Sequence, residues 1–254
     1  MMIAFVTGAS SGMGRCMTKL IAEKCPGIRE IWVTARREAE LMTLSEELPG
    51  KLRCFPGDLQ DPAFRERLFQ SLRDSGATVG ILVNAAGFGR LGLEGTLTEE
   101  ESLGMVRVNC EALTAVTEAL LPYLSKNARV IQFASAAAFL PQPGFAVYAA
   151  TKAYVLSYSI ALRQELKKRG VSVTAVCPGP VDTAFFDLAE AHAASPAYKK
   201  LFLMRTEDVT EAALEGALRK KAVVVPGIPM KTFRLLAKVL PWQLLLVWYR
   251  GGKA

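Results

Sequence analysis

Histidine is nearly missing: the chain has 254 residues and a single histidine, His192. Histidine is the commonest nitrogen ligand for zinc and the usual base of a hydrolytic triad, so we expect neither a metal site nor a Ser-His-Asp triad. Cysteines are few and scattered, at positions 16, 25, 54, 110 and 177, with no C-x-x-C pair. This odd, unclustered set predicts buried thiols in a reducing compartment, the cytoplasm, and argues against a disulfide framework.

Long apolar runs and linkers are missing as well. No uncharged apolar run reaches the roughly 18 residues of a membrane-spanning helix. The first residues, 1–6, lead straight into a glycine-rich turn, so we interpret them as a buried strand and not as a signal peptide. Without a Pro/Gly/Ser-rich linker or a repeat, the sequence predicts a single domain over 1–254. Within it we expect a substrate lid at 184–205 and an apolar basic tail at 226–254.

The net charge is +7, which suits an anionic partner such as nucleic acid, anionic lipid or an anionic cofactor. The basic residues are spread along the chain, and no basic patch is rich in aromatic residues. Nucleic-acid binding is therefore not expected.

Short apolar runs alternate with helical patterns along the whole chain. This alternation predicts an α/β fold in which a doubly wound parallel sheet has helices on both faces and right-handed crossovers. The expected strands are 3–7, 30–35, 52–56, 81–84, 130–135, 171–177 and 222–225. The expected helices are 13–24, 38–48, 62–74, 99–125, 147–169 and 207–220.

A glycine-rich turn joins the first strand to the first helix. It reads Thr7-Gly8-Ala9-Ser10-Ser11-Gly12-Met13-Gly14. Glycines let a backbone approach a pyrophosphate closely, and a helix N-terminus supplies N–H donors and a positive dipole end. The spacing, Gly-x-x-x-Gly-x-Gly, differs from Gly-x-Gly-x-x-Gly, and tight strand-helix packing would also require glycine here. Its place at the first strand-helix junction favours dinucleotide binding.

The second strand ends in two arginines, Arg36 and Arg37, and no acid stands there. An NAD site needs a carboxylate at this point for the ribose hydroxyls, whereas an NADP site needs an arginine for the 2′-phosphate. The pair could instead begin a solvated helix, although cations are mildly unfavourable at a helix N-terminus. We therefore predict NADP(H) as the cofactor.

The third and fourth strands also end in candidate ligands of a cofactor. Asp58 and Leu59 follow the third strand, and Asn84-Ala85-Ala86-Gly87 ends the fourth. The carboxyl ends of strands are where open α/β sheets bind ligands. Asp58 could accept a hydrogen bond from an adenine amine or cap the next helix, for which Asp61 is the better candidate.

The residues that carry chemistry come from three further segments. Tyr148 and Lys152 are four residues apart, which places a phenol and an ammonium on one face of a helix. A nearby cation lowers the pKa of a phenol, although the same pair also occurs on solvated helix faces. Ser135 ends the fifth strand, where its hydroxyl can face the ligand crevice. Asn109 is a misfit inside its expected helix, which indicates a local distortion around a water or a partly exposed polar position.

Taken in order, these motifs resemble the short-chain dehydrogenase/reductase family, over about residues 2–225. The matching residues are Thr7-Gly8-x-x-x-Gly12-x-Gly14, Asp58, Asn84-x-Ala86-Gly87, Asn109, Ser135, Tyr148-x-x-x-Lys152 and Pro178-Gly179. The resemblance implies a seven-stranded Rossmann-like sheet in the order 3-2-1-4-5-6-7. It also implies an NADP(H)-dependent oxidoreductase that interconverts a ketone or aldehyde and an alcohol.

The roles of the site residues follow from the same resemblance. Tyr148 would be the general acid/base, Lys152 would lower its pKa and bind the nicotinamide ribose, and Ser135 would bind the substrate oxygen. Asn109 would hold a water that links Lys152 to solvent. The remaining cofactor contacts are expected at Gly8, Ser10, Ser11, Gly12, Met13, Gly14, Arg36, Arg37, Asp58, Leu59, Asn84, Ala85, Ala86, Gly87, Pro178, Gly179, Val181 and Thr183, with Thr183 at the carboxamide.

Three positions depart from the family pattern. Ala85 replaces the second Asn of the common Asn-Asn-Ala-Gly. Ser11 stands where many NADP-dependent members carry a basic residue, so Arg36, with Arg37, would carry more of the cofactor discrimination. Cys177 replaces an Asn before Pro-Gly, and we expect a buried, unreactive thiol there.

The lid and the tail leave alternatives open. Aromatic and apolar residues of the lid suggest a lipophilic substrate, or simply a lid that packs on its own core. They are Phe185, Phe186, Leu188, Tyr198, Leu201, Phe202 and Leu203, and His192 is expected to be exposed among them. In the tail, Lys231, Arg234 and Lys238 accompany a largely apolar segment that Pro241 divides. Such a segment can lie on a membrane surface, on a sister subunit or over the substrate mouth.

Two other functions stay open beside the enzyme. One is a catalytically idle NADPH-binding sensor or regulator, which the presence of Ser135, Tyr148 and Lys152 disfavours. The other is a lipid-surface protein whose tail carries the function. By resemblance, the helices 99–125 and 147–169 would form the faces of a homodimer or homotetramer.

Overall fold

The sheet is the centre of the structure. The computed structural model describes residues 1–93, 95–183, 189 and 202–250. Within these residues the strands form a seven-stranded parallel sheet in the order β3-β2-β1-β4-β5-β6-β7, which confirms the predicted order and fold class. The strands are β1 (Met2–Thr7), β2 (Glu30–Ala35), β3 (Leu52–Pro56), β4 (Thr78–Asn84), β5 (Leu124–Phe133), β6 (Ser172–Val176) and β7 (Val223–Val224).

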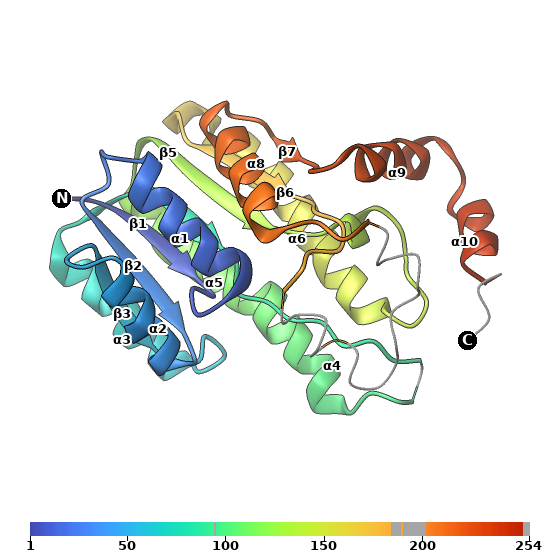
Figure 1. The fold of residues 1–254 in the computed structure, drawn as a ribbon, viewed down its shortest axis with the longest axis horizontal. Coiled ribbons are helices and arrows are strands. Elements are labelled where there is room, and N and C mark those ends of the chain that lie inside the picture. Colours follow the sequence, from blue (N-terminus) through green and yellow to red (C-terminus); the bar gives the residue numbers. More distant parts are fainter. Residues whose placement is uncertain (94, 184–188, 190–201, 251–254) are drawn as a thin grey trace.

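Helices cover both faces of the sheet (Figure 1). One face is covered by α1 (Gly12–Lys24), α2 (Glu38–Glu47) and α8 (Thr206–Leu218). The other is covered by α3 (Pro62–Ser75), α5 (Leu113–Leu120) and α6 (Ala146–Glu165). Because the helices follow the strands one by one, each crossover returns the chain to the same end of the sheet.

Alternating side chains of the central strand β1 fill the two cores. Ala4 and Val6 are buried in the core under α1 and α2, whereas Ile3 and Phe5 are buried in the core under α3 and α5. A strand that is apolar on both faces suits a parallel sheet covered on both sides. The central strands are therefore rigid supports for the residues at their carboxyl ends.

The largest departure from the predicted elements lies in the segment 99–125. Instead of one helix, the chain forms α4 (Glu99–Val106), a π-helical turn η1 (Arg107–Ala112), α5 and a 3-10 turn η2 (Leu121–Tyr123). Strand β5 then begins at Leu124, six residues before the predicted start, because Leu124 pairs with Val79 of β4. The predicted distortion at Asn109 is confirmed, since that residue lies in the π-helical turn.

The chain after β7 forms α9 (Ile228–Val239) and α10 (Trp242–Arg250), which Pro241 separates as predicted. Figure 1 shows both helices projecting beyond the end of the sheet opposite the N-terminus, with α10 outside the body of the molecule. No helix among the described residues is both long and apolar enough to cross a bilayer.

A test of the fold comes from Gly14 in the first turn of α1. A Cβ at Gly14 would lie 2.2 Å from the carbonyl oxygen of Gly8, so Gly14→Ala must push the turn away from the sheet. We expect this variant to lose about 1–3 kcal/mol of unfolding free energy, measured by urea denaturation. Gly27→Ala is the matched control, because no atom lies within 4 Å of its Cβ position, and should change stability by less than about 0.5 kcal/mol. Equal losses in the two variants would contradict the packing argument.

Candidate active site

The site forms where the carboxyl ends of β1 and β4 are held together. The Thr7 hydroxyl oxygen accepts hydrogen bonds from the backbone N–H groups of Ala85 and Ala86, each at 3.1 Å. Gly8, at φ +71°, packs so closely that a Cβ there would lie 2.7 Å from the Ala86 nitrogen. The two strand ends therefore form one continuous backbone floor, which side chains do not cover.

The turn above this floor can accept an anion. In α1 the first turn carries no acidic residue, and the N-cap Ser11 makes no side-chain capping bond. Side chains cap α3, through Asp61, and α4, through the Thr98 capping box, whereas α2, α6, α8 and α9 lack a side-chain cap as α1 does. The N–H groups and positive dipole end of α1 are thus left for a ligand. A Cβ at Gly12 would lie 3.3 Å from a methyl carbon of Thr183, so Thr183 borders the same turn.

Two arginines stand beside the glycine-rich turn. Arg37 donates a hydrogen bond to the Ser10 hydroxyl at 3.1 Å and pairs with Glu40 at 3.4 Å, measured between Nη1 and Oε1. Arg36 is exposed at the end of β2, next to it in the chain. The Arg37 guanidinium is therefore bonded to the turn, and Arg36 is exposed beside it.

The remaining predicted cofactor ligands differ in how they are placed. Asp61 caps α3, as the alternative assignment predicted, and Asp58 accepts a hydrogen bond from the backbone N–H of Gln60 at 2.9 Å. Leu59 is buried in the core. The Asn84 side chain is also buried and donates to Thr117 at 2.9 Å, so Asn84 can offer a ligand only its backbone.

The predicted residues after β6 are joined to other parts of the site. The carbonyl of Pro178 accepts a hydrogen bond from the backbone N–H of Ala136 at 2.8 Å, next to Ser135. Gly179 packs under Met230, and Val181 forms a bridge with Met204. The chain therefore leaves β6 in a fixed path toward Thr183.

Ser135, Tyr148 and Lys152 come together as predicted, at the ends of β5 and α6. Ser135 caps the 3-10 turn η3 (Ala136–Phe139), and its hydroxyl hydrogen-bonds with Tyr148. Lys152 donates to the Phe133 carbonyl at 2.8 Å, with its Nζ 5.7 Å from the centroid of the Tyr148 ring. Tyr148 is 7% exposed and Lys152 6%, so both ionisable groups are almost fully buried.

Burial changes the acid-base behaviour that the sequence predicted. Loss of solvent raises the pKa of Tyr148 to about 12, partly opposed by the hydrogen bond to Ser135. Loss of solvent also lowers the pKa of Lys152 to about 8. The predicted lowering of the Tyr148 pKa by Lys152 is therefore not found, because desolvation raises this pKa and only the hydrogen bond to Ser135 opposes the rise. Near neutral pH, Tyr148 holds its proton.

Asn109 connects three segments through its side-chain amide. Its oxygen accepts from the backbone N–H of Phe88 at 3.1 Å, and its nitrogen donates to the Phe88 carbonyl at 2.9 Å and to the Thr151 hydroxyl at 3.0 Å. Both amide hydrogens are thereby used. The water expected at Asn109 would have to bind an oxygen of this residue, either of its amide or of its backbone.

An apolar wall surrounds Tyr148, and sequence reasoning missed its central member. The ring of Phe145 stacks on that of Tyr148, with centroids 4.2 Å apart. Leu91, Met105 and Ala189 belong to the same buried cluster. Helical spacing gave no signal for this contact, because Phe145 is the N-cap of α6 and lies outside the helix. The predicted lid residues Phe185, Phe186, Leu188, His192, Tyr198 and Leu201 lie outside the described residues, whereas Phe202 and Leu203 are exposed.

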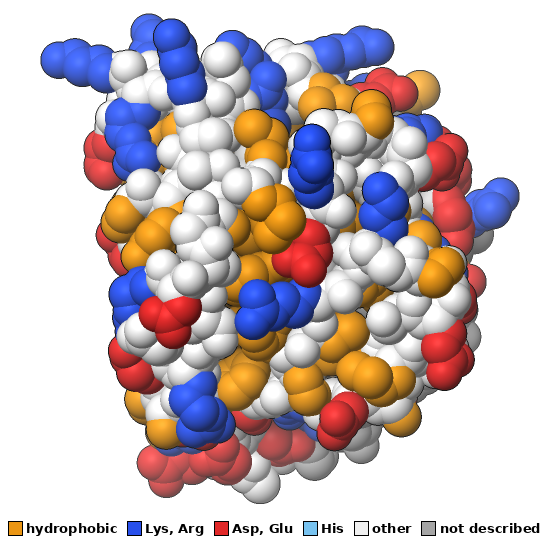
Figure 2. All heavy atoms as spheres, turned by 90° about the vertical axis from the view of Figure 1, so that its left-hand side faces the viewer, with side chains coloured by type: hydrophobic (Ala, Val, Ile, Leu, Met, Phe, Trp, Pro, Cys, Tyr) orange, Lys and Arg blue, Asp and Glu red, His pale blue; other side chains and the backbone are white. Residues whose placement is uncertain are grey.

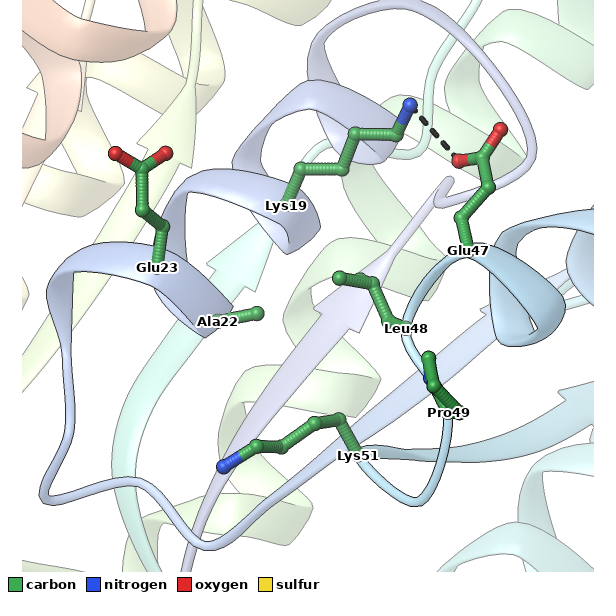
Figure 3. Close-up of a pocket in the computed structure, with 7 residues that line it drawn as sticks. All are labelled: Lys19, Ala22, Glu23, Glu47, Leu48, Pro49 and Lys51. Atoms are coloured by element: carbon green, nitrogen blue, oxygen red, sulfur yellow. Dashed lines mark ion pairs between the residues drawn. The ribbon is translucent and has the colours of Figure 1, made fainter.

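The structure also has a hollow that is separate from this site. It measures about 430 Å³ and lies between the C-terminal end of α1 and the connection from α2 to β3 (Figure 3). Lys19 and Glu47 form an ion pair at 2.8 Å across it. Because Lys51 immediately precedes β3, the hollow is at the amino ends of the strands, away from the predicted site.

Comparison with known proteins agrees with this geometry. Residues 2–193 match the family model described as short chain dehydrogenase. The NADP-dependent 3-hydroxy acid dehydrogenase YdfG of Escherichia coli is 32% identical over 219 residues, covering 83% of this chain and 87% of the relative. Sulfoacetaldehyde reductase 2 of Chromohalobacter salexigens is 33% identical over 221 residues, covering 82% and 85%.

Among solved structures, a short-chain dehydrogenase from Sphingobium yanoikuyae in complex with NADPH superposes with a TM-score of 0.80 at 27% identity. The match covers 100% of this chain and 98% of that one. The parallel sheet with its glycine-rich first turn and these matches together identify an NADP-dependent oxidoreductase. The chain belongs to the short-chain dehydrogenase family, as its motifs predicted.

The buried ammonium of Lys152 makes a prediction about stability and pH. Below about pH 8, Lys152 is protonated in both the folded and the unfolded chain, and the folded chain bears the full cost of burying the charge. Between about pH 8 and 10.5, only the unfolded chain keeps the proton, so stability gains as the pH rises. Relative to Lys152→Met, the wild-type unfolding free energy should rise by about 3 kcal/mol across this window.

Urea unfolding of the two proteins at a series of pH values measures this difference, and groups common to both cancel. If the unfolding free energies of wild type and Lys152→Met differ by the same amount at every pH from 7 to 10.5, the Lys152 ammonium is not destabilised by burial.

Proposed function

We infer that the protein is an NADP(H)-dependent oxidoreductase that interconverts a ketone or aldehyde and an alcohol, with Tyr148 as general acid/base and a lipophilic substrate. The observation that carries this proposal is the meeting of Ser135 with the buried Tyr148 and Lys152, together with an N-terminus of α1 that no side chain caps. The names of two relatives describe a hydroxy acid dehydrogenase and an aldehyde reductase, and one of these is NADP-dependent.

The residues fit NADP(H) at each point where the cofactor needs a partner. The first turn of α1 would take the pyrophosphate, and Arg36 with Arg37 would take the 2′-phosphate. The backbone floor at 85–87 would lie against the nicotinamide ribose, close to Lys152. Bound NADPH supplies the hydride, and the protein aligns the carbonyl carbon with it.

The protonation states favour reduction near neutral pH. Tyr148 holds its proton, so its hydroxyl can donate to a carbonyl oxygen as negative charge develops there. Ser135 would turn its one hydroxyl hydrogen from Tyr148 to the substrate and donate a second hydrogen bond to the same oxygen. The Lys152 ammonium stabilises the phenolate that remains. Asn109 would connect Lys152 to solvent through a water on one of its oxygens.

The surroundings of Tyr148 support the lipophilic substrate. Phe145 covers one face of the phenol ring, and Leu91 and Ala189 complete an apolar wall. Apolar walls with a few convergent polar groups are typical of small-molecule sites. The relatives do not favour the idle NADPH-binding sensor, since each carries the name of a dehydrogenase or reductase. A cytoplasmic homodimer or homotetramer with peripheral membrane contact stays a prediction.

Tyr148→Phe tests the proton donor. The variant removes one oxygen, so NADPH binding, followed by its fluorescence, should persist. Turnover of NADPH against ketones and aldehydes of rising chain length should fall by about 10²–10⁴-fold. Tyr154→Phe is the matched control, because Tyr154 is on the same helix but is largely exposed, and it should keep full activity. Activity in Tyr148→Phe equal to wild type would refute this mechanism, and turnover that falls with chain length would refute the lipophilic pocket.

Arg36→Gln and Arg37→Gln test the choice of cofactor. Each removes a charged donor from the expected 2′-phosphate site, so the KM for NADPH should rise by about 10–100-fold while the KM for NADH stays constant. Arg29→Gln, at the opposite end of β2, is the charge-matched control and should change neither constant. Faster wild-type turnover with NADH than with NADPH would overturn the assignment of these arginines.

A further inference from the structure

Helix α9 has one face against the body and one face exposed. Its half-buried residues are Met230, Phe233, Arg234 and Ala237, which recur with the spacing of a single helix face. Met230 packs on Gly179, and Phe233 contacts Phe139 at 6.3 Å between ring centroids. The helix is thus fixed in orientation, next to the turn that follows Ser135.

The exposed face of α9 is apolar, which is the reverse of an ordinary surface helix. Ile228 is 77% exposed, Leu235 62% and Val239 71%. These three residues are seven and four positions apart, so they form one stripe that points away from the body. Trp242 and Leu244, 55% and 62% exposed, continue the apolar surface into α10. We call these five residues the outer stripe.

All charges along the outer stripe are positive. Residues 226–254 contain Lys231, Arg234, Lys238, Arg250 and Lys253 and no acidic residue. In helical projection, Lys231 and Lys238 both lie along the same side of the stripe. A groove of about 770 Å³ lies between α8, β7 and α9. Its lining adds Arg219 and Lys221 to the basic residues of this region and contains two acidic residues. By contrast, the opposite side of the molecule has acidic and basic side chains interspersed (Figure 2).

We propose that α9 and α10 dock the protein on an anionic membrane surface, with the outer stripe in the interface and the lysines at the lipid headgroups. Apolar residues, tryptophan and flanking basic residues are the features of helices that lie in this plane. The charges disfavour a second copy of the chain as the occupant. A two-fold interface sets the same patch against itself, and a patch that is only positive would repel its copy.

Docking in this way would bring the active site close to the bilayer. Helix α9 contacts Gly179, which follows β6, and Phe139, which ends the turn after Ser135. Helix α9 therefore lies against the turn that follows Ser135. If the proposed function holds, a lipophilic carbonyl compound would reach Tyr148 from the membrane.

Vesicle co-sedimentation of the full chain tests the docking without any turnover. Wild type should bind phosphatidylcholine vesicles that contain about one third phosphatidylglycerol, bind pure phosphatidylcholine at least tenfold more weakly, and dissociate in about 0.5 M NaCl. The double variant Leu235→Gln/Val239→Gln should bind the anionic vesicles at least tenfold more weakly than wild type. Lys231→Glu/Lys238→Glu should lose the preference for anionic lipid.

Two controls match these variants in exposure and charge. Leu218→Gln replaces an exposed leucine of α8, and Lys51→Glu replaces an exposed lysine of the hollow in Figure 3. Both should bind like wild type. NADPH binding by each variant confirms its fold and reports on the proposed function separately.

Equal binding of anionic vesicles by wild type and Leu235→Gln/Val239→Gln would overturn the proposal. A second outcome would also overturn it: wild type forms an oligomer that does not bind vesicles, and the Leu235→Gln/Val239→Gln variant does not form that oligomer. The stripe would then be a self-association surface.

Discussion

The side-chain amide of Asn109 is the constraint on which the site depends. Through three hydrogen bonds it joins the loop after β4, at Phe88, to the helix that carries Tyr148 and Lys152, at Thr151. The π-helical turn places the amide at this point, and Thr151 in turn donates to the carbonyl of Tyr148 at 2.7 Å. The backbone after β4 and the helix face with Tyr148 and Lys152 are thereby fixed relative to each other, which is the preorganisation that the proposed hydride transfer would require.

Burial shifts the pKa values of Tyr148 and Lys152 in opposite directions. Water is removed from Tyr148 and Lys152 alike, so the neutral form of each is favoured. The protein compensates only in part: the Phe133 carbonyl accepts from the ammonium, and Ser135 hydrogen-bonds the phenol. In the proposed mechanism, the neutral phenol would donate its proton, and the neighbouring ammonium, with a pKa of about 8, would stabilise the anion left behind.

Local chemistry made the glycine-rich turn visible, since it follows an apolar strand and opens a helix. The strand order and the meeting of Ser135, Tyr148 and Lys152 were predicted from the family resemblance that the motifs carry. The pKa of Tyr148 did not follow, because it depends on burial by residues distant in the chain, Leu91 and Ala189 among them. The inward direction of the Asn84 amide, and the stacking of Phe145 on Tyr148, also depend on tertiary packing. For Asn109 the sequence indicated a local distortion but not the hydrogen-bond partners, since no sequence pattern specifies partners on other segments.

The cysteines have a consequence for chemical resistance. Burial raises the pKa of the Cys25, Cys54 and Cys110 thiols, and that of Cys177, beside the site, to about 12. The thiolate is the form that peroxide and alkylating agents attack. At neutral pH these four sulfurs stay protonated, so the protein presents little nucleophilic sulfur to such reagents. Cys177, the cysteine nearest the site, is also completely buried, so neither its acidity nor its accessibility favours oxidation.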